Sequence, residues 1–179
     1  DGDDPATVAR NRAQLAELAG LPSAPHWLKQ VHGTDVVRVD VPADPAAPEP
    51  VADALVTTTR GVVLAILTAD CLPVVFAAKD GREIAAAHAG WRGLSKGMLE
   101  ATLAAMRTPA ADLVAWIGPA AGPRRYEVGE NVFDAFVSQD AGAAAAFVPT
   151  RPGHWLADLP ALARRRLVAR GMRAEDIHG

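Results

Sequence analysis

The order of apolar and polar residues along the chain predicts helices and short strands in alternation. Residues 3–20 have helical spacing, with Asp4 as the N-cap, Pro5 in the first turn and Gly20 at the end. Two strands are predicted over residues 26–33 and 34–40, where apolar and polar residues alternate. The proline-rich stretch that follows, residues 41–50, has the composition of a loop.

Short apolar runs separated by turn residues dominate the middle of the chain. The run at 61–70, GVVLAILTAD, has almost no polar alternation, which predicts a central strand buried on both faces. Further strands are predicted at 52–58, 72–79, 83–90 and 112–119, and helices at 94–106, 129–138 and 159–172. Strands interleaved with helices predict one α/β domain built on a mixed sheet.

Composition and charge narrow the classes of function. The 179 residues are 50% hydrophobic and 22% charged, which suits one domain with a sizeable core. The net charge is −3 and no basic block occurs, so no nucleic-acid partner is expected. No apolar stretch is long enough to cross a membrane. A single cysteine allows no internal disulfide, from which we expect a cytoplasmic protein. No pattern indicates an oligomeric state.

Three motifs carry candidate chemistry: KQVHG with His32, TADCLP with Cys71 and AAAHAGWRG with His88. Taken alone, His32 and Cys71 are most simply structural. Each of the three nevertheless ends a predicted strand beside glycine or proline, where α/β sheets gather their sites. Two imidazoles and a thiolate suit Zn²⁺ with a fourth position open. The same residue types also make a cysteine nucleophile with a histidine base, and the sequence leaves both alternatives open.

The segment HAGWRGLSKG suggests an anion site. Gly90 and Gly93 allow close approach of the backbone, Arg92 supplies a planar donor fork, and a helix follows. The simpler alternative is a glycine turn whose arginine pairs with a surface carboxylate. The remaining candidates, for which we expect structural roles, are His26, His154, Glu127 and the arginines at 164–166, expected on a solvated helix face.

The motifs KQVHGTDV, ADALVTT, LTADCLPVVF, AAAHAGWRGL and WIGPAAGPRRYEVGENVFDAF resemble the YfiH family. Its members are named variously as polyphenol oxidase laccases, peptidoglycan editing factors and purine nucleoside phosphorylases. The resemblance implies one α/β sandwich domain over residues 1–179, unlike the cupredoxin fold of true laccases. It also implies a metal site made of His32, Cys71 and His88, which we expect to hold Zn²⁺, with Cu²⁺ as an alternative in vitro.

Two departures from the family pattern affect this expectation. Relatives often have cysteine just before the YEVG motif, where this chain has Arg124 and Arg125, and the basic pair could attract an anion. Relatives also carry an N-terminal segment rich in arginine and glycine and a C-terminal segment similar to RRDG. Neither occurs in this sequence, so we expect part of the substrate site to lie outside it.

The resemblance favours phosphorolysis of adenosine, inosine and methylthioadenosine, with some adenosine deamination. Arg92 and the backbone amide of Gly93 would then hold the phosphate. A laccase reaction needs several coppers, and five histidines with one cysteine are too few ligands. Two alternatives remain: an amide hydrolase that edits peptidoglycan precursors through metal-bound water or a Cys71 nucleophile, and a non-catalytic metal-binding protein.

Overall fold

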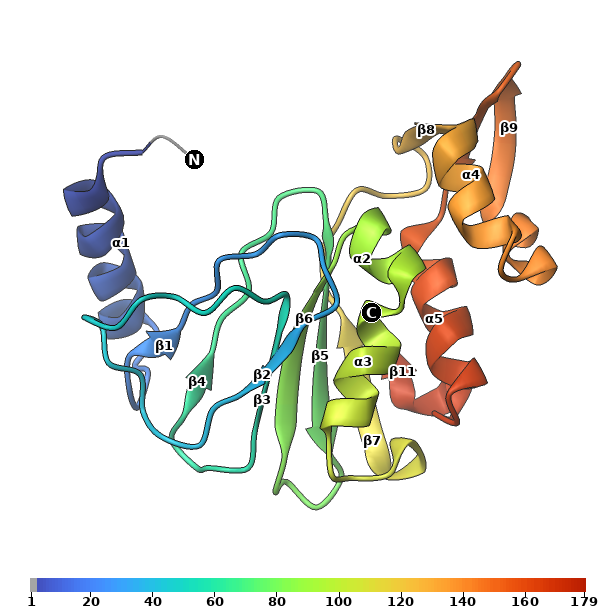
Figure 1. Ribbon diagram of the computed structural model, residues 1–179. Helices are drawn as coiled ribbons and strands as arrows, with labels where there is room; N and C mark the ends of the chain where they lie inside the picture. Colours follow the sequence, from blue (N-terminus) through green and yellow to red (C-terminus); the bar gives the residue numbers. More distant parts are fainter. Residues whose placement is uncertain (1–2) are drawn as a thin grey trace.

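A computed structural model describes residues 3–179, and a six-stranded sheet lies at its centre, in the order β11-β7-β5-β6-β3-β2 (Figure 1). Strands β3, β6, β5 and β7 run antiparallel to their neighbours in that series, whereas β2 and β11 pair in parallel at the two edges. The predicted mixed-sheet α/β fold is therefore confirmed. The strands are β2 Val36–Arg38, β3 Ala54–Thr57, β5 Leu72–Ala78, β6 Ile84–Ala89, β7 Leu113–Ile117 and β11 Ile177–His178.

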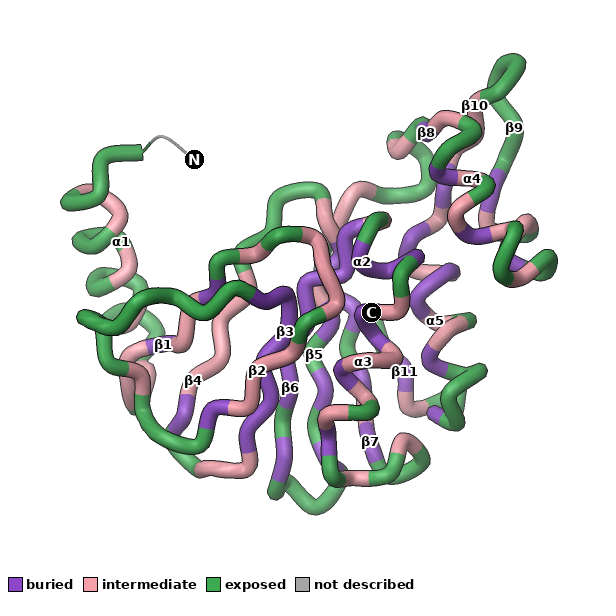
Figure 2. The backbone as a smooth tube through the Cα atoms, viewed as in Figure 1, coloured by how far each residue is buried: buried purple, intermediate pink, exposed green. Residues whose placement is uncertain are grey.

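Helices cover one face of this sheet, and β5 and β7 accordingly alternate between buried residues and more exposed ones. Along β5, Leu72, Val74 and Phe76 are buried, while Val75 and Ala77 between them are exposed. The buried set packs against α2 (Trp91–Lys96), α3 (Met98–Ala105) and α5 (Leu159–Ala169) in one large core (Figure 2). Asp158 caps α5 by accepting a hydrogen bond from Ala161 N at 2.9 Å.

The opposite face is covered only in part. At the β3 side, Leu55 packs with Leu28, Val39, Ala52 and Val62 in a second, smaller core. Towards β7 the same face carries the exposed apolar side chains of Val75, Ile84 and Trp116.

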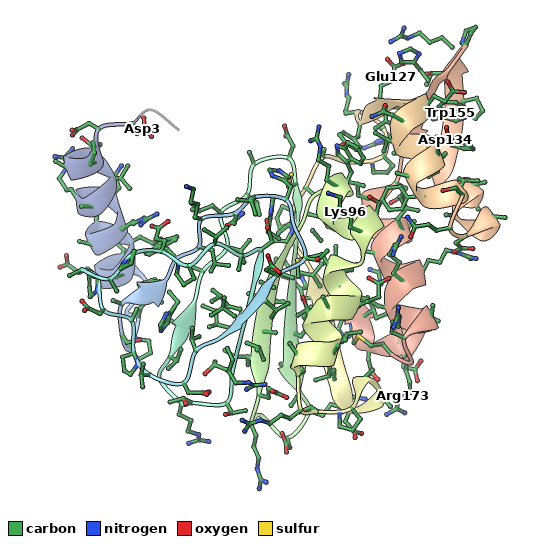
Figure 3. The ribbon with its side chains drawn as sticks, viewed as in Figure 1. Asp3, Lys96, Glu127, Asp134, Trp155 and Arg173 are labelled. Carbon is green, nitrogen blue, oxygen red and sulfur yellow. The ribbon has the colours of Figure 1, made fainter. Side chains whose placement is uncertain are left out.

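A smaller lobe stands beside the sheet, and its antiparallel strands are ordered β8-β10-β9 (Figure 1). It holds β8 (Glu127–Gly129), α4 (Glu130–Val137), β9 (Phe147–Arg151) and β10 (His154–Ala157). Phe133 of α4 stacks on Trp155 of β10 with 4.4 Å between ring centroids. Glu127, Asp134 and Trp155 all lie in this lobe (Figure 3). Three short 3₁₀ helices complete the part of the chain that the structure describes: η1 Ala110–Asp112, η2 Ala141–Ala146 and η3 Ala174–Asp176.

The first predicted helix is confirmed as α1, Pro5–Leu18, with Asp4 Oδ2 accepting from Thr7 N at 2.9 Å. Within Pro5–Leu18 no residue is buried, and the helix lies apart from the large sheet (Figure 1). Neither α1 nor any other helix within residues 3–179 combines the length and the apolar character that a membrane span requires.

Two predicted strands were wrong. Residues 26–33 form only the end of β1 (Pro25–His26) and an isolated bridge between Lys29 and Val51. Residues 61–70 contain only β4 (Val63–Leu64), which pairs with β1 outside the large sheet. The run is apolar because Leu64 and Ile66 cover the second core, not because it lies between two strands. The helix predicted at 94–106 begins earlier and divides into α2 and α3 at Gly97, whose φ is 101°.

Candidate functional site

Three side chains far apart in the sequence come together at one end of the large sheet. The potential ligand atoms of His32, Cys71 and His88 all lie within 4.8 Å of one another. Cys71 Sγ is 3.7 Å from His32 Nε2, and the two imidazole rings meet edge to face with 4.8 Å between centroids. The convergence that the sequence predicted is confirmed, whereas the role of the three residues as metal ligands stays a prediction.

The elements that carry these residues differ from the prediction. His32 lies in a loop between β1 and β2, and Cys71 comes immediately before β5 rather than at the end of a buried strand. His88 is in β6, next to the last residue of that strand. Because β5 and β6 are antiparallel with Leu72 opposite Ala89, the start of β5 and the end of β6 share one end of the sheet.

Asp53, which is not among the residues predicted from the sequence, joins the two histidines. Its carboxylate is fully buried, and Oδ1 lies 2.9 Å from both His32 N and His88 Nδ1. Oδ2 accepts from Val31 N at 3.2 Å and from Gly33 N at 2.7 Å. The only signal in the sequence is one acidic residue at the head of the apolar run ADALV, in alternation with the core residue Leu55.

The electrostatics of Asp53 follow from these contacts. Burial raises the pKa of the carboxyl group, but hydrogen bonds from His88, Gly33, Val31 and His32 outweigh burial and leave the pKa below its ordinary value. The group is therefore a carboxylate at neutral pH. A carboxylate that accepts from a histidine ring is the usual support of a metal-binding imidazole.

His32 has a left-handed backbone conformation, with φ of 58°. For a residue with a side chain this conformation costs free energy, and it persists where surrounding contacts hold it. The three consecutive amides of residues 31–33 all point at the Asp53 carboxylate, which provides that restraint.

Two glycines of the HAGWRG motif are required by close packing. A Cβ at Gly90 would lie 2.6 Å from Cys71 Sγ and 3.2 Å from His32 Cδ2. A Cβ at Gly93 would lie 2.9 Å from the carbonyl oxygen of Gly33. Both glycines therefore let the start of α2 approach the His32 loop. The role of Gly93 in binding phosphate stays a prediction.

The charges around Cys71 act in opposite directions. Burial raises the pKa of the Cys71 thiol, the negative charge of Asp70 raises it further, and the positive charge of Arg92 opposes them. Arg92 is exposed, with its guanidinium 4.7 Å from the centroid of the Trp91 ring. Within residues 3–179 no carboxylate forms a salt bridge with it. Its charge is thus available to a ligand beside the cluster.

The donor set fits a metal of the zinc or copper type. Two imidazoles and a thiol are nitrogen and sulfur donors, which both Zn²⁺ and Cu²⁺ bind. His88 Nδ1 is engaged by Asp53, so Nε2 is the ring atom that would face a metal. The side chains that could hold one are therefore His32, Cys71 and His88.

The other candidates lie elsewhere. His26 Nε2 is 2.8 Å from Val41 O, and His154 Nδ1 is 3.1 Å from Pro152 O, in agreement with the structural roles expected for them. Glu127 lies on the small lobe (Figure 3). Its carboxylate accepts hydrogen bonds from Thr150 and Arg151.

The arginines at 164–166 differ from one another. Arg165 is exposed and pairs with Asp140, whereas Arg166 is largely covered and pairs with Glu100. Arg164 donates to the carbonyl of Ile177. The solvated helix face predicted for this triplet is therefore correct for Arg165 alone. Arg124 and Arg125 are exposed.

Comparisons with known proteins show which proteins this chain is similar to. The family model described as multi-copper polyphenol oxidoreductase laccase matches residues 1–179. A Xylella fastidiosa protein named purine nucleoside phosphorylase is 59% identical over 180 residues, which cover 99% of this chain and 69% of the relative. The Escherichia coli protein named purine nucleoside phosphorylase YfiH is 47% identical, with 99% and 71% covered.

Solved structures show the same fold. A Neisseria meningitidis protein of the DUF152 family superposes with a TM-score of 0.89 at 44% identity, covering 99% of this chain and 71% of that one. A Bacillus licheniformis protein titled YfiH gives a TM-score of 0.88 at 26% identity, with the same shares covered. A family model that spans the whole chain, together with relatives named YfiH at high identity, shows that this chain belongs to the YfiH family of laccase-like proteins.

Proposed function

We propose that this chain is a metal-dependent purine nucleoside phosphorylase, which converts adenosine, inosine or methylthioadenosine and phosphate to a free base and a sugar 1-phosphate. The observation that carries the proposal is the cluster of His32, Cys71 and His88, with the charge of Arg92 beside it. The names of the Xylella and Escherichia relatives support the same reaction here.

The proposed cofactor is Zn²⁺, held by His32, Cys71 and His88. Zinc sites that act in catalysis commonly have three protein ligands and leave the fourth position to water or substrate. Cu²⁺ binds most nitrogen and sulfur sites more tightly than Zn²⁺, so copper can enter the site in vitro. A bound metal would supply a Lewis acid that polarises a substrate oxygen or nitrogen.

Arg92 has the clearest role among the chain's own residues. In phosphorolysis a phosphate oxygen bonds to C1′ of the ribose while the C1′–N9 bond breaks, and the base leaves with the electron pair and takes up a proton. Phosphate must be held against C1′ in spite of its negative charge. The exposed guanidinium of Arg92 can bind it through two parallel hydrogen bonds, and the amide of Gly93 at the start of α2 is the proposed second donor.

Two other reactions fit this chain less well. A multi-copper oxidase needs more metal ligands than this chain offers. The sequence has only five histidines, and two of them, His26 and His154, bond to backbone carbonyls. An amide hydrolase with a cysteine nucleophile needs a thiolate. Burial and Asp70 both raise the pKa of the Cys71 thiol, which opposes its ionisation without a metal.

Phosphate dependence tests the proposal. The Zn²⁺-loaded protein is incubated with adenosine in buffer with phosphate or with sulfate as a matched anion, and the products are separated. We expect adenine and ribose 1-phosphate with phosphate alone. Equal release of adenine in sulfate would identify a hydrolase and contradict the proposal. Inosine in the same separation would show adenosine deamination, which is proposed as a second activity of the cluster.

A further inference from the structure

We propose that Asp53 is the positioning residue of both histidines of the cluster: its side chain fixes the ring of His88 and holds the loop that presents His32. The inference rests on the proposed metal site in one respect, namely that the two histidines bind a metal. The geometry itself does not depend on it. Four donors reach the two carboxylate oxygens, at 2.7–3.2 Å.

The contact between Asp53 Oδ1 and His88 Nδ1 sets the tautomer of the His88 ring. Oδ1 and Oδ2 of Asp53 both accept from backbone N–H groups, which can only donate. The carboxylate therefore presents acceptor atoms on every side, and His88 Nδ1 must be the donor in the 2.9 Å contact. A neutral ring that carries its proton on Nδ1 keeps a lone pair on Nε2, which is the atom left to face Cys71 and His32.

The other contacts set the position of His32. The amides of residues 31–33 converge on one carboxylate, and this convergence bends the loop at His32 into its left-handed conformation. Without the carboxylate, three amides in a partly buried loop would have no acceptor, and φ of His32 would no longer be held at 58°. Asp53 thus positions His88 by a contact with the ring of His88, and it positions His32 by contacts with the backbone of the His32 loop.

Asparagine at this position makes a specific test, because it keeps the size of the side chain and replaces one acceptor with an NH₂ donor. If the NH₂ takes the place of Oδ1, it faces His88, whose ring must then accept on Nδ1 and carry its proton on Nε2. If it takes the place of Oδ2, it opposes the amides of Val31 and Gly33. Either orientation disturbs one histidine.

Glu83→Gln provides a matched control. Glu83 is the other buried carboxylate of the sheet, and it accepts from Arg107 N, Thr108 N and Thr108 Oγ1. It comes just before β6, whereas His88 lies near the end of that strand, roughly 16 Å away along an extended chain. The same chemical change there removes a comparable set of hydrogen bonds without contact to the cluster.

The experiment titrates Zn²⁺ into metal-free protein against a chromophoric chelator and records the ¹⁵N resonances of His88. For Asp53→Asn we expect Zn²⁺ affinity to fall about 10- to 100-fold, with the Nε2–H tautomer gained or the amide resonances of residues 31–33 displaced. For Glu83→Gln we expect wild-type affinity and tautomer despite a lower melting temperature. Equal losses of affinity in the two variants would overturn the inference, because general destabilisation would then explain both.

Two further measurements keep the outcomes separate. If Asp53→Asn does not fold, the wild-type protein still decides the matter: His88 must be the Nδ1–H tautomer, and the amides of residues 31–33 must exchange slowly with solvent. An Nε2–H tautomer in the wild type would refute the positioning role. A wild type that has the Nδ1–H tautomer but binds no Zn²⁺ would refute the proposed metal site and leave the role of Asp53 standing.

Discussion

Replacing Gly90 with alanine tests whether the cluster works as a closely packed unit. Gly90 precedes α2 with φ of −57°, a value that alanine adopts freely, so the substitution acts through its methyl group alone. That methyl would lie 2.6 Å from Cys71 Sγ and 3.2 Å from His32 Cδ2. Non-bonded heavy atoms rest at about 3.5–4.0 Å, so the sulfur must move by about 1 Å.

The overlap of the added methyl group with Cys71 Sγ sets the kind of cost to expect. Overpacking of this kind costs roughly 1–3 kcal/mol. In the metal-free variant, Cys71 can turn away and relieve most of the strain, but binding a metal requires the sulfur to return. The strain therefore reduces the free energy of Zn²⁺ binding, and a reduction of 1–3 kcal/mol corresponds to a loss of affinity of roughly 5- to 150-fold.

Competition titration of Zn²⁺ against a chromophoric chelator measures this loss. The matched control is Gly122→Ala, since a Cβ at Gly122 has no heavy atom within 4 Å and φ there is not in the left-handed region. We expect wild-type affinity for the control and a clear loss for Gly90→Ala. Wild-type affinity in Gly90→Ala would show that the sulfur is not a ligand in the observed position, and the reasoning would fail.

Two further predictions concern Arg92 and Glu83. Arg92→Ala should raise the KM for phosphate about tenfold or more, because a charged hydrogen-bonding group is lost, and should leave Zn²⁺ affinity nearly unchanged; an unaltered KM in initial-rate measurements would exclude Arg92 from the phosphate site. Burial raises the pKa of Glu83, but hydrogen bonds from Arg107, Thr108 and Arg38 outweigh it and leave the pKa below its ordinary value of 4.5. Its ionisation therefore stabilises the fold above that pH, and this contribution is lost as pH falls through the lowered pKa. In urea unfolding at pH 7, we expect Glu83→Gln to be less stable than the wild type by about 2 kcal/mol. This difference should shrink below pH 4.5. A difference that does not change with pH would contradict the ionised, hydrogen-bonded state of Glu83.

The sequence predicted correctly those helices and strands whose ends are marked by capping or turn residues close by in the chain. Asp4 starts α1 and Asp158 starts α5, each by accepting a hydrogen bond from the amide three residues later, and Pro5 occupies the first turn of α1. Strands β6 and β7 were found because their apolar runs are short and bounded by turns. The run 61–70 was misassigned because an apolar segment that covers a core has the same composition as one buried in a sheet.

The candidate site was predictable only as a set of residue types. His32, Cys71 and His88 stood out because reactive side chains beside glycine or proline are informative. Asp53 did not stand out, because its partners are 20 to 35 residues away and three of them are backbone amides, which leave no mark on the sequence. The packing requirement at Gly90 and the left-handed His32 likewise depend on contacts made only after folding.

The metal content of Cys71→Ser, measured together with its phosphorolytic activity, tests the central claim most directly. Serine keeps the size of the side chain but is a poor ligand for Zn²⁺, so we predict that metal and phosphate-dependent release of adenine are lost together. His32→Ala and His88→Ala should behave in the same way, whereas His26→Ala, outside the cluster, should keep both. Full zinc occupancy in an inactive Cys71→Ser protein would contradict the account and identify Cys71 as a nucleophile.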